Sequence, residues 1–146
     1  TPLYRYHGHL RNSESHTSVF AVCSACILNG RLLWNEHVSI RRIADDFADD
    51  PESSAELLMR TPSAPEYSTE ADWVFCCGLP AKFIGSPKSI QEAILVSERD
   101  EHWSRGRPDD DIMVRDLRHH PPRKLSEISM FECFECSKRF WIDQFL

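Results

Sequence analysis

The sequence predicts a small α+β protein in which zinc-ribbon-like knuckle hairpins from both chain ends pack with a small antiparallel sheet and about two helices. Two C-x-x-C pairs, Cys23-Ser24-Ala25-Cys26 and Cys133-Phe134-Glu135-Cys136, stand near opposite ends of the 146 residues. Between them, short apolar runs bounded by Gly and Pro alternate with two helix-start signals. The length suits one metal-stapled domain over residues 1–146.

The first cysteine pair falls in a predicted hairpin. Tyr4 and Tyr6 alternate with polar neighbours, which predicts a short edge strand near the N-terminus. The apolar residues 19–22 lead into Cys23, Asn29-Gly30 is a tight-turn signal, and residues 31–34 are the expected returning strand.

Two helices are predicted from their starts. Residues 50–52 read Asp-Pro-Glu, with Asp as N-cap and Pro at the first helical position, and the helix is expected to reach Arg60 with Leu57 and Leu58 inward. Strands are expected at 73–76 and 82–85. The second helix opens at Ser86-Pro87. Its expected inward face holds Ile90, Ala93, Ile94 and Ser97.

The second C-x-x-C pair lies within residues 130–143, which alternate apolar and polar on both sides of the cysteines. This pattern predicts a second hairpin with the cysteines at its turn. The histidines His119-His120 before two prolines indicate a surface break between these elements.

The four cysteines of these pairs indicate one structural Zn²⁺. Two thiolates two residues apart can both turn toward one ion, and two such pairs close a tetrahedral site. The predicted ligands are Cys23, Cys26, Cys133 and Cys136. The alternatives are cysteine clusters without metal or a redox C-x-x-C, which would require a βαβ context. Vicinal Cys76-Cys77 is interpreted as two reduced core thiols, with metal involvement as the alternative.

The charge indicates the kind of partner. With 17 basic against 23 acidic residues, the net charge is −6, which disfavours general nucleic-acid binding. It suits a basic partner, or simply keeps the protein in solution. No apolar run could span a bilayer and the N-terminus has no secretory pattern, so we expect a cytosolic protein that inserts in no membrane.

Four landmarks follow one another along nearly the whole chain: the opening Tyr4-Arg5-Tyr6-His7, the helix end at 57–62, the segment 77–85 and the terminal knuckle at 131–143. In this order they resemble segments of the CbrC family of bacterial colicin-tolerance proteins. The family usually has two further ligand segments. Here residues 39–42 stand where its Cys-Pro-Trp-Cys should lie, and Cys76 and Ala81 replace a His and a Cys of the other.

The resemblance implies two zinc sites in the family, one of which this chain has lost. It pairs Cys23 and Cys26 with Cys133 and Cys136, and it leaves Cys77 as a relic. It also implies tolerance to a nuclease-type colicin.

No enzyme is expected. The chain has no Gly-rich phosphate loop, no Ser-centred elbow and no H-E-x-x-H helix. The run Asp109-Asp110-Asp111 is more simply a solvated loop than an acid cluster, and a nucleophilic Cys76 or Cys77 would need a nearby His.

The leading hypothesis is therefore an immunity protein that binds a cognate toxin and occludes its active site. Acidic side chains would cover a basic cleft, with exposed aromatics as anchors. The candidate contacts are Asp45, Asp46, Asp49, Asp50, Glu98, Asp100, Glu101, Asp109, Asp110 and Asp111.

Two other hypotheses remain. The second is a zinc-ribbon module that binds nucleic acid or a translation or transcription complex. Its candidate basic face holds Arg115, Arg118, Arg123, Lys124, Lys138 and Arg139. The third is an enzyme of unknown type.

Overall fold

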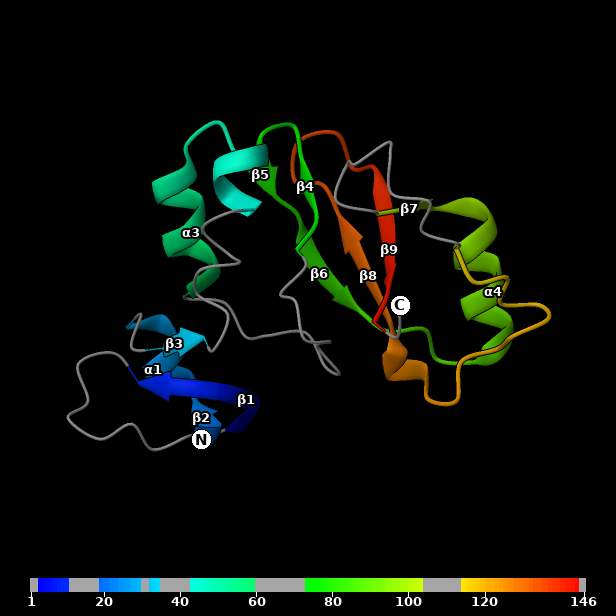
Figure 1. Cartoon of the computed structure of the whole chain (residues 1–146), viewed down its shortest axis with the longest axis horizontal. Helices are drawn as coiled ribbons and strands as arrows, with labels where there is room; N and C mark the ends of the chain where they lie inside the picture. The colour runs from blue at the N-terminus through cyan, green and yellow to red at the C-terminus, as the bar shows by residue number, and fades with distance from the viewer. Residues whose placement is uncertain are drawn as a thin grey trace. The chain divides into compact units, whose positions relative to one another are not determined.

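The computed structural model describes residues 3–10, 19–29, 32–34, 43–59, 73–103 and 114–144, and within them helices combine with small, mostly antiparallel sheets (Figure 1). The predicted α+β class is confirmed. The chain divides into two compact units, Thr1–Ser63 and Ala64–Leu146, each described here by itself. One metal-stapled domain over the whole chain stays a prediction.

Unit 1 contains a three-stranded sheet in the order β2-β1-β3. β1 (Leu3–Leu10) lies in the centre and is antiparallel to both β2 (Val19–Cys23) and β3 (Leu32–Trp34). The short helix α1 (Ser24–Leu28) follows β2 directly. The predicted hairpin between β2 and β3, and the predicted edge position of the first strand, are therefore wrong.

The physical reason is that β1 can pair along both of its edges. The segments on either side of the first cysteine pair, β2 and β3, each take one edge. Because β2 and β3 are both antiparallel to β1, they are parallel to each other, and parallel strands cannot be joined by a tight turn. The helix α1 provides part of the longer connection that they need.

The predicted first helix is α3 (Pro51–Met59), and Asp50 is its N-cap, with Oδ1 accepting a hydrogen bond from the Ser53 N–H at 3.1 Å. Its buried face holds Ser54, Ala55 and Leu58. Leu57 is 49% exposed, so its inward placement was wrong. Residues 43–47 form a further helical turn before α3.

Unit 2 contains a four-stranded sheet in the order β6-β8-β9-β7 (Figure 1). β8 (Ile128–Glu132) and β9 (Arg139–Asp143) form the predicted terminal hairpin, with Phe131 opposite Phe140. β6 (Lys82–Gly85), predicted at those residues, pairs antiparallel with β8. The sheet is completed by β7 (Glu101–His102), which runs parallel to β9.

The described part of unit 2 also contains a short hairpin, one α-helix and a 3₁₀ turn. β4 (Phe75–Cys76), the end of the strand predicted at 73–76, pairs with β5 (Leu79–Pro80). α4 (Ile90–Arg99) begins after Ser89, whose Oγ accepts a hydrogen bond from the Glu92 N–H at 3.0 Å, so the start predicted at Ser86-Pro87 is three residues early. The 3₁₀ turn η1 (Leu125–Glu127) leads into β8.

One hydrophobic core cluster of unit 2 lies between α4 and the sheet. Ala93 and Val96 of α4 pack with Leu117, Ile128 and Trp141 in one buried cluster. The predicted inward face of the helix was correct for Ala93 and for the partly buried Ile94, which packs against the cluster. It was wrong for Ile90, which is exposed. No helix in the described ranges has the length and apolar character needed to cross a membrane.

Candidate metal centre

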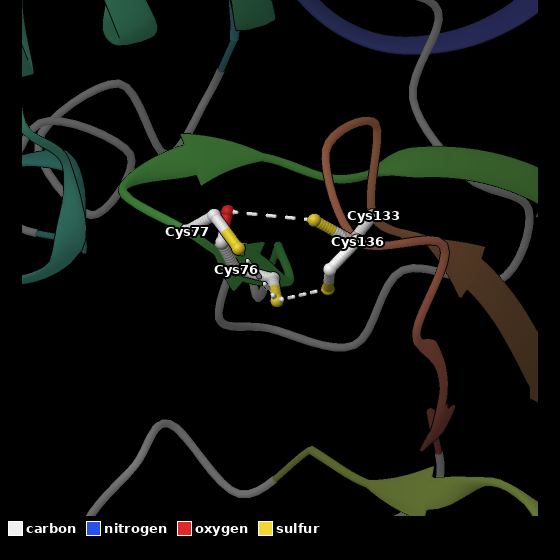
Figure 2. A group of neighbouring side chains, drawn as sticks. All are labelled: Cys76, Cys77, Cys133 and Cys136. Carbon is white, nitrogen blue, oxygen red and sulfur yellow. Dashed lines mark hydrogen bonds between the residues drawn. The ribbon is translucent and has the colours of Figure 1, made fainter.

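Four cysteine sulfurs gather at two facing turns of unit 2 (Figure 2). Cys76 and Cys77 come from the β4–β5 hairpin, and Cys133 and Cys136 from the turn between β8 and β9. All four Sγ atoms lie within 4.8 Å of one another. Among the described residues this is the group of side chains arranged to hold a metal ion.

The first turn is set by its backbone. Cys77 and Gly78 are the two residues between the paired strands, and both have positive φ, at 54° and 72°. Positive φ at both central residues defines the type I′ turn, which matches the twist of a two-residue hairpin. Gly78 adopts this conformation without strain, whereas Cys77 does so with a Cβ, which L residues rarely tolerate.

The second turn is closed by its backbone hydrogen bonds. The Cys133 N–H donates to the Lys138 carbonyl at 2.9 Å, and the Ser137 N–H donates to the Cys133 carbonyl at 3.1 Å. Ser137 has φ of 59°, which reverses the chain after Cys136. The two bonds and this reversal keep both cysteine side chains on the side of the turn that faces the β4–β5 hairpin (Figure 2).

Aromatic packing brings the two turns together. Trp73, three residues before Cys76, meets Phe131, two residues before Cys133, edge to face with ring centroids 5.2 Å apart. The Trp73 indole N–H donates to the Ala81 carbonyl at 2.8 Å, and the Ala81 N–H donates to the Val74 carbonyl at 2.8 Å. Since Trp73, Phe131 and Ala81 are all buried, this contact fixes the β4–β5 hairpin against β8.

The sulfur spacing fits a tetrahedral metal site. Zinc–thiolate bonds of about 2.3 Å place the sulfurs of a regular tetrahedron about 3.8 Å apart. The Sγ atoms of Cys76 and Cys136 are 3.6 Å apart, and those of Cys76 and Cys77 are 3.9 Å apart. Four soft thiolate donors with this spacing could therefore hold a metal ion with little movement.

The pKa values of the thiols differ within the cluster, and Cys133 loses its proton more readily than Cys76 and Cys77. Burial raises the pKa of Cys133, but backbone N–H groups of Cys136 and Glu135 and the neighbouring thiols outweigh it and lower the pKa to about 7. Burial, followed by hydrogen bonds to Cys133 and Cys136, raises the pKa of Cys76. The hydrogen bond to Cys136 raises the pKa of Cys77. A bound cation would offset the repulsion between the thiolates.

The structure thus places the predicted ligands Cys133 and Cys136 with Cys76 and Cys77. Cys77 is exposed and Cys76 half-buried, so the interpretation of this pair as core thiols was wrong. Cys23 ends β2 and Cys26 lies in α1, both in unit 1. Hydrogen bonds from the Cys26 backbone and thiol lower the pKa of Cys23. Coordination by Cys23 and Cys26 together with Cys133 and Cys136 stays a prediction.

A sequence signal for the first turn was present. The Cys-Gly dipeptide at 77–78 between apolar runs is a tight-turn signal, and in a hairpin it puts Cys76 and Cys77 at the tip. What the sequence did not show was the element that this tip would face.

The candidate acidic contacts fall into two groups. Asp45, Asp46, Asp49 and Asp50 are all exposed at or near the helical turn 43–47 and the start of α3. The described candidate residues of unit 2 form ion pairs with basic residues of the same unit. Glu98 pairs with Arg118, Asp100 pairs with Arg99 at 2.8 Å, and Glu101 pairs with Lys138. Asp109, Asp110 and Asp111 lie outside the described residues.

The histidines considered above lie at the surface of unit 2. His119 and His120 are exposed in the turn that follows Asp116. The Nδ1 atom of His119 lies 2.6 Å from Oδ2 of Asp116, and this hydrogen bond lowers the pKa of the Asp116 carboxyl. Neither histidine belongs to the group of four cysteines.

The chain matches one family of known proteins over nearly its whole length. The model of a family described as "Uncharacterised protein family (UPF0167)" matches residues 6–144. No curated protein and no solved structure matched the chain.

Proposed function

We propose that this chain, which belongs to the uncharacterised protein family UPF0167, is a cytosolic zinc protein that binds and neutralises a bacterial toxin. The observation that carries the zinc part is the group of four sulfurs, all within 4.8 Å of one another, at two facing turns. The toxin part is supported by the net charge of −6 and by the resemblance to the CbrC colicin-tolerance family.

Zinc is the metal that the donor set favours. Four thiolates in a tetrahedron are typical of structural zinc sites, which leave no position open for a substrate. In this role the ion would join the β4–β5 hairpin to the β8–β9 hairpin, and its binding free energy would add to the stability of unit 2. A closed site of this kind agrees with a binding protein rather than an enzyme.

The zinc proposal is tested by metal content. The wild-type protein should bind one zinc per chain, and the variants Cys76→Ser and Cys133→Ser should lose it. The matched control is the double variant Cys23→Ser/Cys26→Ser, which should keep it. Loss of zinc from the control with retention in Cys76→Ser would assign the ion to the Cys23–Cys26 pair instead.

The partner is expected to be a basic protein domain. Asp45, Asp46, Asp49 and Asp50 are exposed within six residues of each other, and such a group attracts a basic cleft at long range. Glu98, Asp100 and Glu101 are already neutralised by Arg118, Arg99 and Lys138, so the aspartates of unit 1 are the stronger candidates.

The nucleic-acid hypothesis receives less support from the same ion pairs. Lys138 pairs with Glu101 and Arg139 with Glu132, while Arg115 is partly buried between Glu127 and Asp143. Basic side chains held in this way are less available for phosphates. Filter binding at low and high salt would reveal a salt-dependent affinity if the hypothesis were right.

The toxin proposal is tested by capture and by charge reversal. Zinc-loaded protein should retain one stoichiometric basic partner from a lysate of its host, and that purified partner should lose its toxicity when the protein is added. Replacing all four aspartates by lysine should weaken binding at least tenfold. If neutralisation survives that substitution, the aspartates are not the contact surface.

A further inference from the structure

The four-cysteine cluster is accessible to solvent on one side. Cys77 and Cys136 are exposed and Cys76 is half-buried, whereas Cys133 is 2% exposed. A metal site enclosed in a protein core protects all of its sulfurs from solvent. In this cluster, small polar oxidants can reach at least the sulfurs of Cys77 and Cys136. Oxidation of cysteine follows exposure as well as thiolate character.

Two sulfurs from different hairpins are well placed to join. The Sγ atoms of Cys76 and Cys136 are 3.6 Å apart and point toward each other from facing turns (Figure 2). A disulfide bond of about 2.05 Å requires them to approach by about 1.6 Å. Cys76 and Cys77 are further apart, at 3.9 Å, and a disulfide between neighbours would close a strained ring through one peptide bond.

We infer that the cluster is also a peroxide-sensitive disulfide site, in which Cys136 reacts with a hydroperoxide and Cys76 completes the disulfide as the metal ion is released. The inference rests on the proposed zinc binding for the release step. Cys133 is buried and stays reduced, and Cys77 is left as the second reduced sulfur.

The chemistry balances with hydrogen peroxide as the oxidant. The Cys136 thiolate attacks one peroxide oxygen, the O–O bond breaks, and the leaving hydroxide takes a proton to become water, which leaves a sulfenic acid on Cys136. The Cys76 sulfur then attacks the Cys136 sulfur, the S–O bond breaks, and the leaving hydroxide takes up the proton of the Cys76 thiol to become a second water. The two cysteine sulfurs have lost two electrons in total, and the metal has lost two ligands.

The disulfide would replace the metal as the link between the two hairpins. The Trp73–Phe131 contact that holds the hairpins together does not involve the cysteines, so the fold of unit 2 should survive the exchange. Oxidation would then remove the charge of the metal–thiolate group from this surface without unfolding it.

The experiment uses the full-length, zinc-loaded protein. Zinc content is measured first, and hydrogen peroxide is then added at one equivalent while a chromophoric chelator reports zinc release. Free thiols are alkylated, and the protein is digested after glutamate, which separates Cys133 from Cys136 at Glu135. Fragmentation between Cys76 and Cys77 assigns the bonded residue. The expected result is one zinc released per Cys76–Cys136 disulfide, reversed by a dithiol reductant with added zinc.

The control is the Cys23→Ser/Cys26→Ser variant, which should release zinc and form the same disulfide at the same rate. Zinc retained after stoichiometric peroxide, a disulfide confined to Cys23–Cys26, or one between Cys76 and Cys77 would overturn the inference. A protein that holds no zinc before oxidation would contradict the proposed function alone, since the same peptide map still tests whether Cys76 and Cys136 join.

Discussion

The Sγ atom of Cys76 lies 3.6 Å from that of Cys136, although 60 residues separate them in sequence. Each belongs to a hairpin turn whose backbone is held by its own hydrogen bonds, and neither turn contains more than two cysteines. Neither turn alone offers enough ligands to close a tetrahedral site. A complete set of four sulfurs therefore forms only when the two turns pack against each other.

Removing the metal is expected to destabilise unit 2. At a free zinc concentration a thousandfold above the Kd, binding contributes about 4 kcal/mol to the free energy of unfolding, and a strong chelator should remove that amount. Fluorescence of the buried Trp73 and Trp141 during thermal unfolding would report the fall in Tm. The Cys23→Ser/Cys26→Ser variant should show the same fall, and a chelator-insensitive Tm would contradict the assignment of zinc to the cluster.

Replacing Arg115 by methionine is expected to destabilise the protein by about 3–5 kcal/mol. The Arg115 Nε lies 2.8 Å from Asp143 Oδ2, and its Nη2 lies 3.2 Å from Glu127 Oε2. The two carboxylate side chains are 0% and 2% exposed, so they would be left buried without their cation. Urea unfolding would measure the change.

A matched control for this variant is Arg118→Met. Its pair with Glu98 is exposed on both sides, and solvent-exposed pairs contribute little to the free energy of unfolding, so this variant should be far less destabilised. Equal losses for the two variants would show that burial does not determine the cost.

Stability is expected to fall as the pH drops below about 6.5, in part through His102. Burial lowers the pKa of this imidazole, and the nearby Asp143 carboxylate opposes the shift only in part. Because the folded pKa lies below the unfolded one, the unfolded chain binds the proton first, and the lost stability grows until the pH reaches the folded pKa.

The His102→Phe variant tests that expectation. Phenylalanine keeps the edge-to-face contact that His102 makes with Trp141 at 4.6 Å but cannot take up a proton. Unfolding measured from pH 7 to pH 5.5 should show a shallower loss in this variant than in the wild type. The exposed His120→Gln should retain the wild-type slope, and an unchanged slope in His102→Phe would rule out a contribution from His102.

Ser137→Gly is expected to stabilise the protein by up to about 1 kcal/mol. Ser137 has φ of 59°, a conformation that costs an L residue about 1–2 kcal/mol. Glycine removes this strain but loses more chain entropy on folding, so only part of the energy is gained. Thermal unfolding would show a higher Tm. The neighbouring Glu135→Gly, at a residue without positive φ, should instead lower it, and equal effects would show that backbone strain is not the cause.

Several local features followed from the sequence because their causes are local. Asp50 caps α3 since its side chain reaches the N–H of Ser53 in the same turn. The alternation around Cys133 and Cys136 placed β8 and β9 as a hairpin, because a period of two is typical of strands, although four consecutive residues of β9 are buried in the structure. The α+β class followed from these elements together.

Other features could not be predicted because they depend on residues far apart in sequence. The central position of β1 and the exposure of Leu57 depend on what each element packs against. The start of α4 at Ser89 was missed for a different reason, because its capping hydrogen bond with Glu92 is local and the earlier Ser86-Pro87 signal was taken as the helix start instead.

The sequence by itself indicated that each C-x-x-C pair could supply half of a metal site, since two neighbouring thiolates can turn toward one ion but cannot close a tetrahedron. It did not indicate such a role for Cys76 and Cys77. Only the tertiary structure decided that Cys133 and Cys136 face Cys76 and Cys77. The physical reason is the buried contact between Trp73 and Phe131, which joins two hairpins through packing that no local pattern encodes.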